Sequence, residues 1–189
     1  MPLAKWRKYT AMNARFFFDT RSVLLSALLL AALPSQAQAQ APLDGRLLGI
    51  TEQVLQASFS HIYRVSKPLA GPHGLRGLWA LANTSVSGLA FETTFFLKNK
   101  VLNRIEQRWT ATANQCSPSA SFTKLVSDMR LKYGAGLAST DSTGTGATQR
   151  SEAWVAGDAD VLAYLNQSPS QCAILVIYKP HVEEDASTL

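Results

Sequence analysis

The sequence contains few of the residues from which metal centres and catalytic sites are usually built. Its 189 residues include only two cysteines and three histidines. None of the histidines, His61, His73 and His181, lies in an HExxH or HxH pattern, and the cysteines lack CxxC spacing. The chain also lacks the GxSxG motif of serine hydrolases and the GxxxxGK[ST] motif that cradles phosphate. We therefore predict no metal ligand, no cofactor and no catalytic residue.

Charge is sparse as well, and the basic part of it is concentrated at the start of the chain. Charged residues make up 16% of the sequence, the formal net charge is +5 and the pI is about 9.4. Without residues 1–41, basic and acidic side chains are almost equal in number. The high pI therefore describes the N-terminal region rather than a binding surface, and we predict no nucleic-acid partner. The basic residues of this region are Lys5, Arg7, Lys8, Arg15 and Arg21.

One continuous apolar run, residues 23–33, is too short to cross a membrane. At about 1.5 Å per residue it covers roughly 16 Å, about half of the ~30 Å hydrocarbon core. The tripeptide Ala37-Gln38-Ala39 follows it and matches an A-x-A cleavage site. We expect residues 1–39 to be a cleaved signal peptide of a bacterial protein, with Met1 or Met12 as the start. The alternative is that the run forms a buried helix.

The predicted destination of the mature chain is the periplasm or the medium. No cysteine directly follows the apolar run, so the chain has no acceptor for a lipid and no stable membrane anchor after cleavage. In an oxidising compartment the only two cysteines, Cys116 and Cys172, are expected to form a disulfide. A metal-binding pair or a reactive thiol are the alternatives, and neither cysteine has the cationic neighbours that would activate a thiol.

The first half of the mature chain reads as a helix followed by strands. Apolar residues recur at helical spacing over residues 47–65, and residues 68–77 are rich in proline and glycine. Three strand-like stretches follow at residues 78–81, 89–97 and 101–109. The last two are separated by a polar turn and predict a hairpin.

The second half repeats this order. Pro118 is suited to the first turn of a helix, and Gly134 is suited to its end. A Ser/Thr/Gly-rich loop over residues 138–148 then precedes three predicted strands at residues 152–156, 161–165 and 173–178. The last strand is apolar on both faces, which predicts a place in the middle of the sheet. Between Pro118 and Gly134 the apolar face of the helix consists of Phe122, Leu125, Val126, Met129 and Tyr133.

We therefore predict an α+β fold in one domain, residues 40–180. It consists of two similar helix-plus-three-strand units, residues 43–110 and 116–180, packed as an antiparallel sheet with the helices on one face. Residues 181–189 are expected to be a disordered tail.

This order of elements resembles the β-lactamase-inhibitor-protein-like fold of exported bacterial proteins. The resemblance rests on residues 47–109 and 122–178, with the LKYG segment at residues 131–134 closing the second helix and Trp154 opening the strands after it. Members of such folds mostly bind other proteins, which implies the same role here. No functional residue of that family is carried over, because its inhibitory-loop motif is not present.

Four residues are candidates for contact with a partner or ligand. His73 and Arg76 lie in the glycine-dense loop of residues 71–77, where an imidazole and a guanidinium could bind an anion. Trp79 is an aromatic residue of the type favoured at interfaces. Glu92 lies between apolar neighbours in a predicted strand and would need an arginine across the hairpin if its face were buried.

The function predicted from these features is a non-catalytic, exported module that binds another protein. It would use an open sheet face or the loop of residues 68–77. One alternative is a small-ligand or lipid-binding periplasmic protein, which requires an apolar cavity on the order of several hundred Å³. A less favoured alternative is a small hydrolase, which requires Glu92, His73 or Asp158 to converge with perturbed pKa values.

Overall fold

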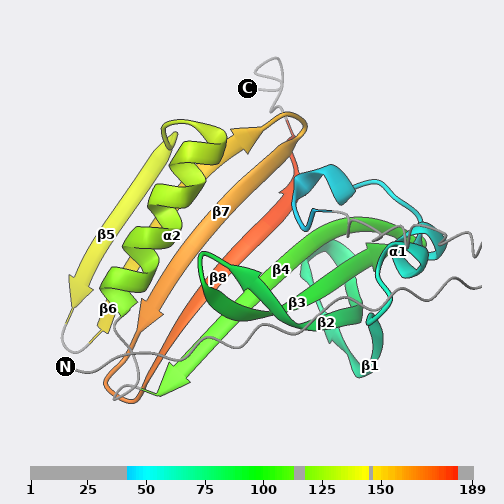
Figure 1. The fold of residues 1–189 in the computed structure, drawn as a ribbon, viewed down its shortest axis with the longest axis horizontal. Coiled ribbons are helices and arrows are strands. Elements are labelled where there is room, and N and C mark those ends of the chain that lie inside the picture. The colour runs from blue at the N-terminus through cyan, green and yellow to red at the C-terminus, as the bar shows by residue number, and fades with distance from the viewer. Residues whose placement is uncertain (1–41, 113–117, 145–146, 183–189) are drawn as a thin grey trace, which may run out of the picture. The chain divides into compact units, whose positions relative to one another are not determined.

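A single eight-stranded antiparallel sheet dominates the computed structural model (Figure 1). The structure describes residues 42–112, 118–144 and 147–182. The predicted signal peptide, Cys116 and residues 183–189 lie outside this part of the chain. The strand order is β1-β2-β3-β4-β8-β7-β6-β5, so the two halves of the chain meet where β4 pairs with β8. The strands are β1 (Tyr63–Ala70), β2 (Arg76–Val86), β3 (Leu89–Lys98), β4 (Val101–Thr112), β5 (Ala138–Gly144), β6 (Ala147–Ala156), β7 (Ala159–Gln167) and β8 (Gln171–Pro180).

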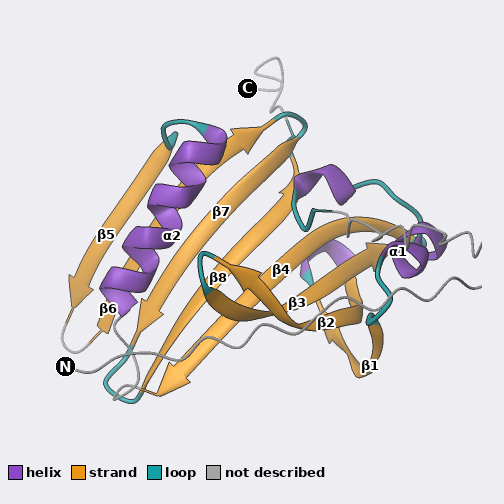
Figure 2. Cartoon of the chain, viewed as in Figure 1, coloured by secondary structure: helices purple, strands orange, loops and turns teal. Residues whose placement is uncertain are grey.

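Two α-helices accompany the sheet in the described residues (Figure 2). They are α1 (Glu52–Ser58) and α2 (Pro118–Tyr133), and there are two short 3₁₀ turns, η1 (Gly45–Leu47) and η2 (Pro72–Gly74). None of the helices in the described residues is both long and apolar enough to span a bilayer.

The core lies between the helices and one face of the sheet. Side chains alternate along each strand, so the paired residues Phe95, Ile105, Tyr178 and Val161 point to the same side. The helix α2 lies against β6, β7 and β8 on this side, whereas Phe59, which follows α1, stacks on Phe95 with ring centroids 5.8 Å apart. Large fully buried side chains of this core are Leu55, Phe91, Phe95, Leu102, Ile105, Phe122, Leu125, Trp154, Val161, Leu165 and Ile174.

The prediction of an α+β fold built from two helix-plus-three-strand units is wrong. The protein is largely a β-sheet protein in which each half supplies one helix and four strands. The two additional strands, β1 and β5, form the two edges of the sheet. An edge strand with both faces exposed has no apolar alternation to reveal it, and this is why the sequence pattern missed both.

The strand β1 occupies residues where the end of a helix and a proline-rich break were expected. The predicted helix of residues 47–65 ends at Ser58, and the next residue, Phe59, is extended with a φ of −135°. Almost all of β1 is exposed, and its pairing with β2 is irregular between Arg64 and Leu69. Pro68 is tolerated because an edge strand has one side that makes no ladder hydrogen bonds.

The strand β5 replaces the loop expected over residues 138–148. It pairs with β6 without a register shift from Ala138↔Ala153 to Gly144↔Ala147. A hydroxyl–hydroxyl bond of 2.7 Å between Thr140 and Ser151 links the two strands across the sheet. Backbone pairing with β6 therefore specifies this strand, because its own ASTDSTG sequence has no apolar face.

Candidate functional site

A cavity of about 730 Å³ lies between the β2–β3 hairpin and α2, and we call it the hairpin cleft. Its floor includes Gln107 of β4 and Tyr178 of β8, and the hairpin forms its roof. The side formed by α2 includes Asp128, Met129 and Lys132, and the opposite end is formed by Leu43, Phe59 and His61.

The shape of the hairpin follows from its backbone. The turn residues Ser87 and Gly88 have φ values of 51° and 83°, as in the two-residue turns that match the twist of paired strands. The register between β2 and β3 shifts between Leu81 and Thr84, where Asn83 has a φ of 55°. Such bulges bend and twist a strand. The hairpin reaches α2, where Ser87 is hydrogen-bonded to Asp128.

The walls of the hairpin cleft are apolar near the core and polar at the mouth. Buried Phe59, Leu81 and Met129 belong to the same cluster as the core beneath the helices. At the mouth, Lys132 Nζ donates to Asp44 Oδ2 at 2.9 Å, and Lys124 Nζ donates to Asp128 Oδ2 at 2.7 Å. The Asp128 carboxylate, which borders the cleft, therefore already has a cation beside it, and Lys132, which also borders the cleft, already has a carboxylate beside it.

Gln107 is the polar side chain at the base of the cleft. It is 1% exposed, and neither its Nε2 nor its Oε1 has a hydrogen-bond partner among the described residues. The predicted strand of residues 101–109 could have revealed it, because every second residue of a strand points to the same side, which places Gln107 between Ile105 and Trp109. A polar residue within that apolar series is the signal that the sequence analysis missed.

Tyr178 borders the cleft as a neutral hydroxyl group. Burial raises the pKa of Tyr178 well above its ordinary value of 10.0, and interactions with Tyr133 and the Asp44 carboxylate act in the same direction. The phenol therefore remains protonated at any physiological pH.

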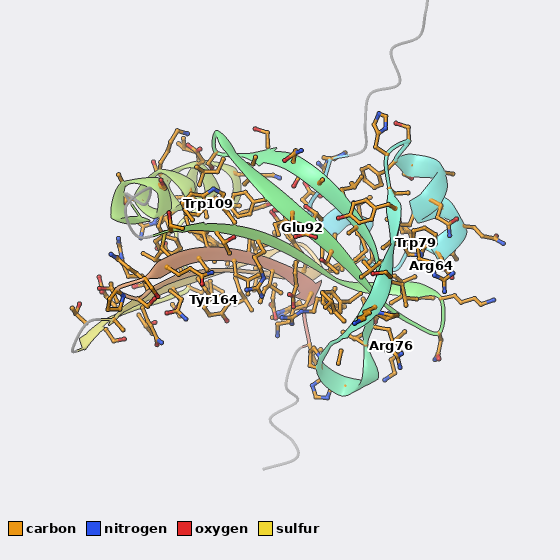
Figure 3. All side chains as sticks on the ribbon, turned by 90° about the horizontal axis from the view of Figure 1, so that it is seen from below. Arg64, Arg76, Trp79, Glu92, Trp109 and Tyr164 are labelled. Carbon is orange, nitrogen blue, oxygen red and sulfur yellow. The ribbon has the colours of Figure 1, made fainter. Side chains whose placement is uncertain are left out.

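A second concave region lies on the face of β4, β8, β7 and β6 that points away from the helices, which we call the outer face. A groove of about 390 Å³ in this face is bordered by Arg108, Leu175 and Tyr164. These three residues lie on adjacent strands in register, since Arg108 pairs with Leu175 and Leu175 pairs with Tyr164. Tyr164 is 38% exposed and points away from the side on which Trp109 lies (Figure 3).

The structure does not bring the four predicted contact residues to one place (Figure 3). His73, with a φ of 52° in η2, and Arg76 are exposed around the β1–β2 turn. The Trp79 indole Nε1 donates to Glu52 Oε1 of α1 at 2.8 Å, so this side chain helps to hold α1. On the opposite face of the sheet, Glu92 accepts a hydrogen bond of 3.3 Å from the Tyr63 hydroxyl and pairs in register with Arg108.

The residues named for a hydrolase are also dispersed. Asp158 lies in the β6–β7 turn, where its carbonyl accepts from the His181 backbone N–H at 2.9 Å, whereas His73 lies in η2. Ser121 and Lys124 of α2 have the SxxK spacing, but Lys124 is exposed and pairs with Asp128. Within the described ranges, no group of three or more His, Cys, Asp or Glu side chains could hold a metal ion.

Comparison with known proteins adds no family to this description. No family model, no curated protein and no solved structure matches the chain. The resemblance to the β-lactamase-inhibitor-protein-like fold therefore stays a prediction, and the functional argument rests on the geometry of this chain.

Proposed function

We propose that the chain is an exported, non-catalytic binding protein that holds a small amphipathic molecule in the hairpin cleft. The observation that carries the proposal is the volume of the cleft, about 730 Å³, together with its walls of Phe59, Leu81 and Met129. Small-molecule sites typically measure about 300–1,000 Å³ and combine apolar walls with a few polar groups. The export part of the proposal rests on the apolar run and A-x-A site of the leader.

The cleft favours a ligand that is partly apolar. Its inner wall is continuous with the hydrophobic core, so an apolar chain would be removed from water there, at about 25 cal/mol per Å² buried. The charged side chains of Lys132, Lys124 and Asp128 are partly exposed and would remain in contact with solvent.

Binding of a fluorescent apolar probe tests this proposal. We expect N-phenyl-1-naphthylamine to gain fluorescence on the purified mature protein and to bind in the cleft. Val86→Trp, on the same face of the hairpin as Thr84, should fill the cleft and weaken probe binding by about tenfold, which is roughly 1.4 kcal/mol.

Ala90→Trp is the matched control. Ala90 is exposed on the same hairpin and is not part of the cleft lining, so the same bulky residue there should leave probe affinity unchanged. Circular dichroism must show that both variants fold. Equal probe affinity for Val86→Trp and the unmodified protein would exclude the hairpin cleft as the binding site.

The groove of the outer face supports a second candidate function, the binding of another protein. Arginine and tyrosine are enriched among residues that dominate binding energy, and Arg108 and Tyr164 flank Leu175 in this groove. A photo-crosslinking residue at position 164 should capture a bacterial envelope protein, whereas one at Leu131, exposed on α2, should not. Identical capture at both positions would argue against this function.

A further inference from the structure

The Gln107 carboxamide is placed where a buried polar group is costly. It projects from β4 on the core side, in register with Thr93 of β3 and Val176 of β8. An unsatisfied buried donor or acceptor costs about 1–3 kcal/mol. Gln107 carries both kinds of group and has no partner for either among the described residues, although it borders a cavity of about 730 Å³. Folding alone gives no reason for a glutamine here.

The neighbouring hydroxyl groups are already engaged with each other. Thr84 Oγ1 donates to the Phe91 carbonyl at 3.0 Å and lies 2.7 Å from Thr93 Oγ1. Because the single Thr84 proton is used on Phe91, the Thr93 proton is the one shared between the two hydroxyls. Thr93 therefore has no proton for Gln107 Oε1, and Val176 offers no polar side-chain atom. The carboxamide is isolated from the polar network beside it.

The chemistry of the carboxamide defines what would complement it. A glutamine side chain presents an acceptor oxygen next to an NH₂ donor, so its best partner presents a donor next to an acceptor. An amide group of a ligand has this pattern in one plane. A charged head group is disfavoured beside Gln107, because this buried carboxamide carries no charge that would compensate a buried ion.

We infer that the hairpin cleft selects uncharged amphiphiles that carry an amide group, which Gln107 recognises by paired hydrogen bonds. This inference rests on the proposed function and adds the chemical class of the ligand. In this arrangement the apolar chain lies along Phe59, Leu81 and Met129. Both polar atoms of Gln107 are covered in this structure, so the side chains around them must shift for the amide to reach them.

Displacement of N-phenyl-1-naphthylamine by matched ligands tests the inference. Decanamide has a donor and an acceptor, whereas methyl decanoate has the same chain with acceptors only. We expect decanamide to displace the probe at about tenfold lower concentration, because the ester leaves the Gln107 acceptor unpaired. In Gln107→Leu the preference for the amide should disappear, so that decanamide and methyl decanoate displace the probe at the same concentration. Gln107→Met is the second variant, of closer shape, if the leucine variant does not fold.

Gln149→Leu is the control, since Gln149 lies exposed on β6 beside the outer groove and should keep the preference for the amide. Equal displacement by the two ligands in the unmodified protein would overturn the inference while leaving the proposed function intact. A preference that persists in Gln107→Leu would overturn it as well, because another group would then recognise the amide. Absence of both probe and decanamide binding would overturn the proposed function and the inference together.

Discussion

Asp44 shows what a satisfied buried polar residue looks like in this protein. It is 3% exposed, yet it accepts hydrogen bonds from the Arg46 backbone N–H at 3.1 Å, from the Arg46 guanidinium and from Lys132 Nζ. Burial alone would raise the pKa of Asp44, but these donors outweigh it and lower the pKa from 3.8 to about 2. Gln107 is equally buried and has none of this support among the described residues. The contrast between the two residues is the reason to assign Gln107 to ligand binding.

The depressed pKa of Asp44 predicts an acid-dependent contribution to stability. A carboxyl whose pKa is lower in the folded state stabilises the protein above its unfolded pKa, and the contribution disappears as the pH falls from about 4 towards 2. Asp44→Asn should lower the free energy of unfolding by about 1 kcal/mol at pH 7, a value reduced for solvent screening at the exposed Arg46.

Thermal melts of the unmodified protein and Asp44→Asn between pH 7 and pH 2 provide the measurement. The difference in melting temperature should shrink steadily below pH 4. Asp141→Asn is the control, because Asp141 is exposed and its contact with Arg150 is 3.3 Å long. A difference for Asp44→Asn that stays constant down to pH 2 would show that the ion cluster does not depend on the charge of Asp44.

At the scale of elements, the helix α2 is held to the sheet by an ion pair as well as by its apolar face. Arg130 donates from Nε and Nη2 to the two oxygens of Glu152 on β6, at 2.6 and 2.8 Å. The Glu152 side chain is buried, and a Cβ added at Gly136 would lie 2.5 Å from its Oε1. Glycine at position 136 therefore leaves the space that the Glu152 carboxylate occupies.

This close approach predicts that Gly136→Ala destabilises the protein by about 1–3 kcal/mol, as expected for overpacking. The carboxylate cannot move away from the new methyl group without loss of its paired bonds to Arg130. Chemical denaturation should show that Gly136→Ala lowers the free energy of unfolding much less in a Glu152→Ala background, because the effects of neighbouring substitutions are not additive. An equal loss of unfolding free energy with and without the Glu152 carboxylate would mean that the backbone at position 136, and not the carboxylate, requires glycine.

The elements that the sequence revealed are those with a buried face. The helix from Pro118, the 89–97 and 101–109 hairpin and the central position of β8 all follow from apolar periodicity, and the structure contains them. The sequence analysis missed the strands β1 and β5, because backbone hydrogen bonds to the neighbouring strand determine an edge strand more than its own apolar pattern does. The sequence analysis also missed the hairpin cleft, because the cleft depends on the bulge near Asn83 that bends the hairpin. A bulge depends on the pairing of two strands and cannot be read from one strand alone.

At the scale of the whole molecule, the pairing of β4 with β8 joins the two halves of the chain. Ile105 pairs with Tyr178, and Thr112 pairs with Gln171, so this central ladder brings together residues that are distant in the sequence. Contacts of such large sequence separation carry a high loop-closure cost, which covalent links reduce by constraining the unfolded chain. Cys172 lies at the end of this ladder, opposite Ala111, one residue before β4 ends.

The predicted disulfide between Cys116 and Cys172 would stabilise this junction. Cys116 lies outside the described residues, so the bond stays a prediction, whereas Cys172 is buried at the start of β8. The loop-entropy model gives an upper value of about 4 kcal/mol for a link of this span. Cys116→Ser and Cys172→Ala should therefore lower the melting temperature by similar amounts under oxidising conditions.

Reduction separates the loss of the link from the loss of a buried side chain. With reductant, the melting temperature of the unmodified protein should fall to that of Cys116→Ser, whereas Cys116→Ser itself should not respond. Thiol titration of the denatured, unreduced protein should find no free thiol. Two titratable thiols, together with a melting temperature that does not change with reductant, would show that the junction of β4 and β8 is held without a covalent link. That result would also remove one of the two arguments for an oxidising compartment.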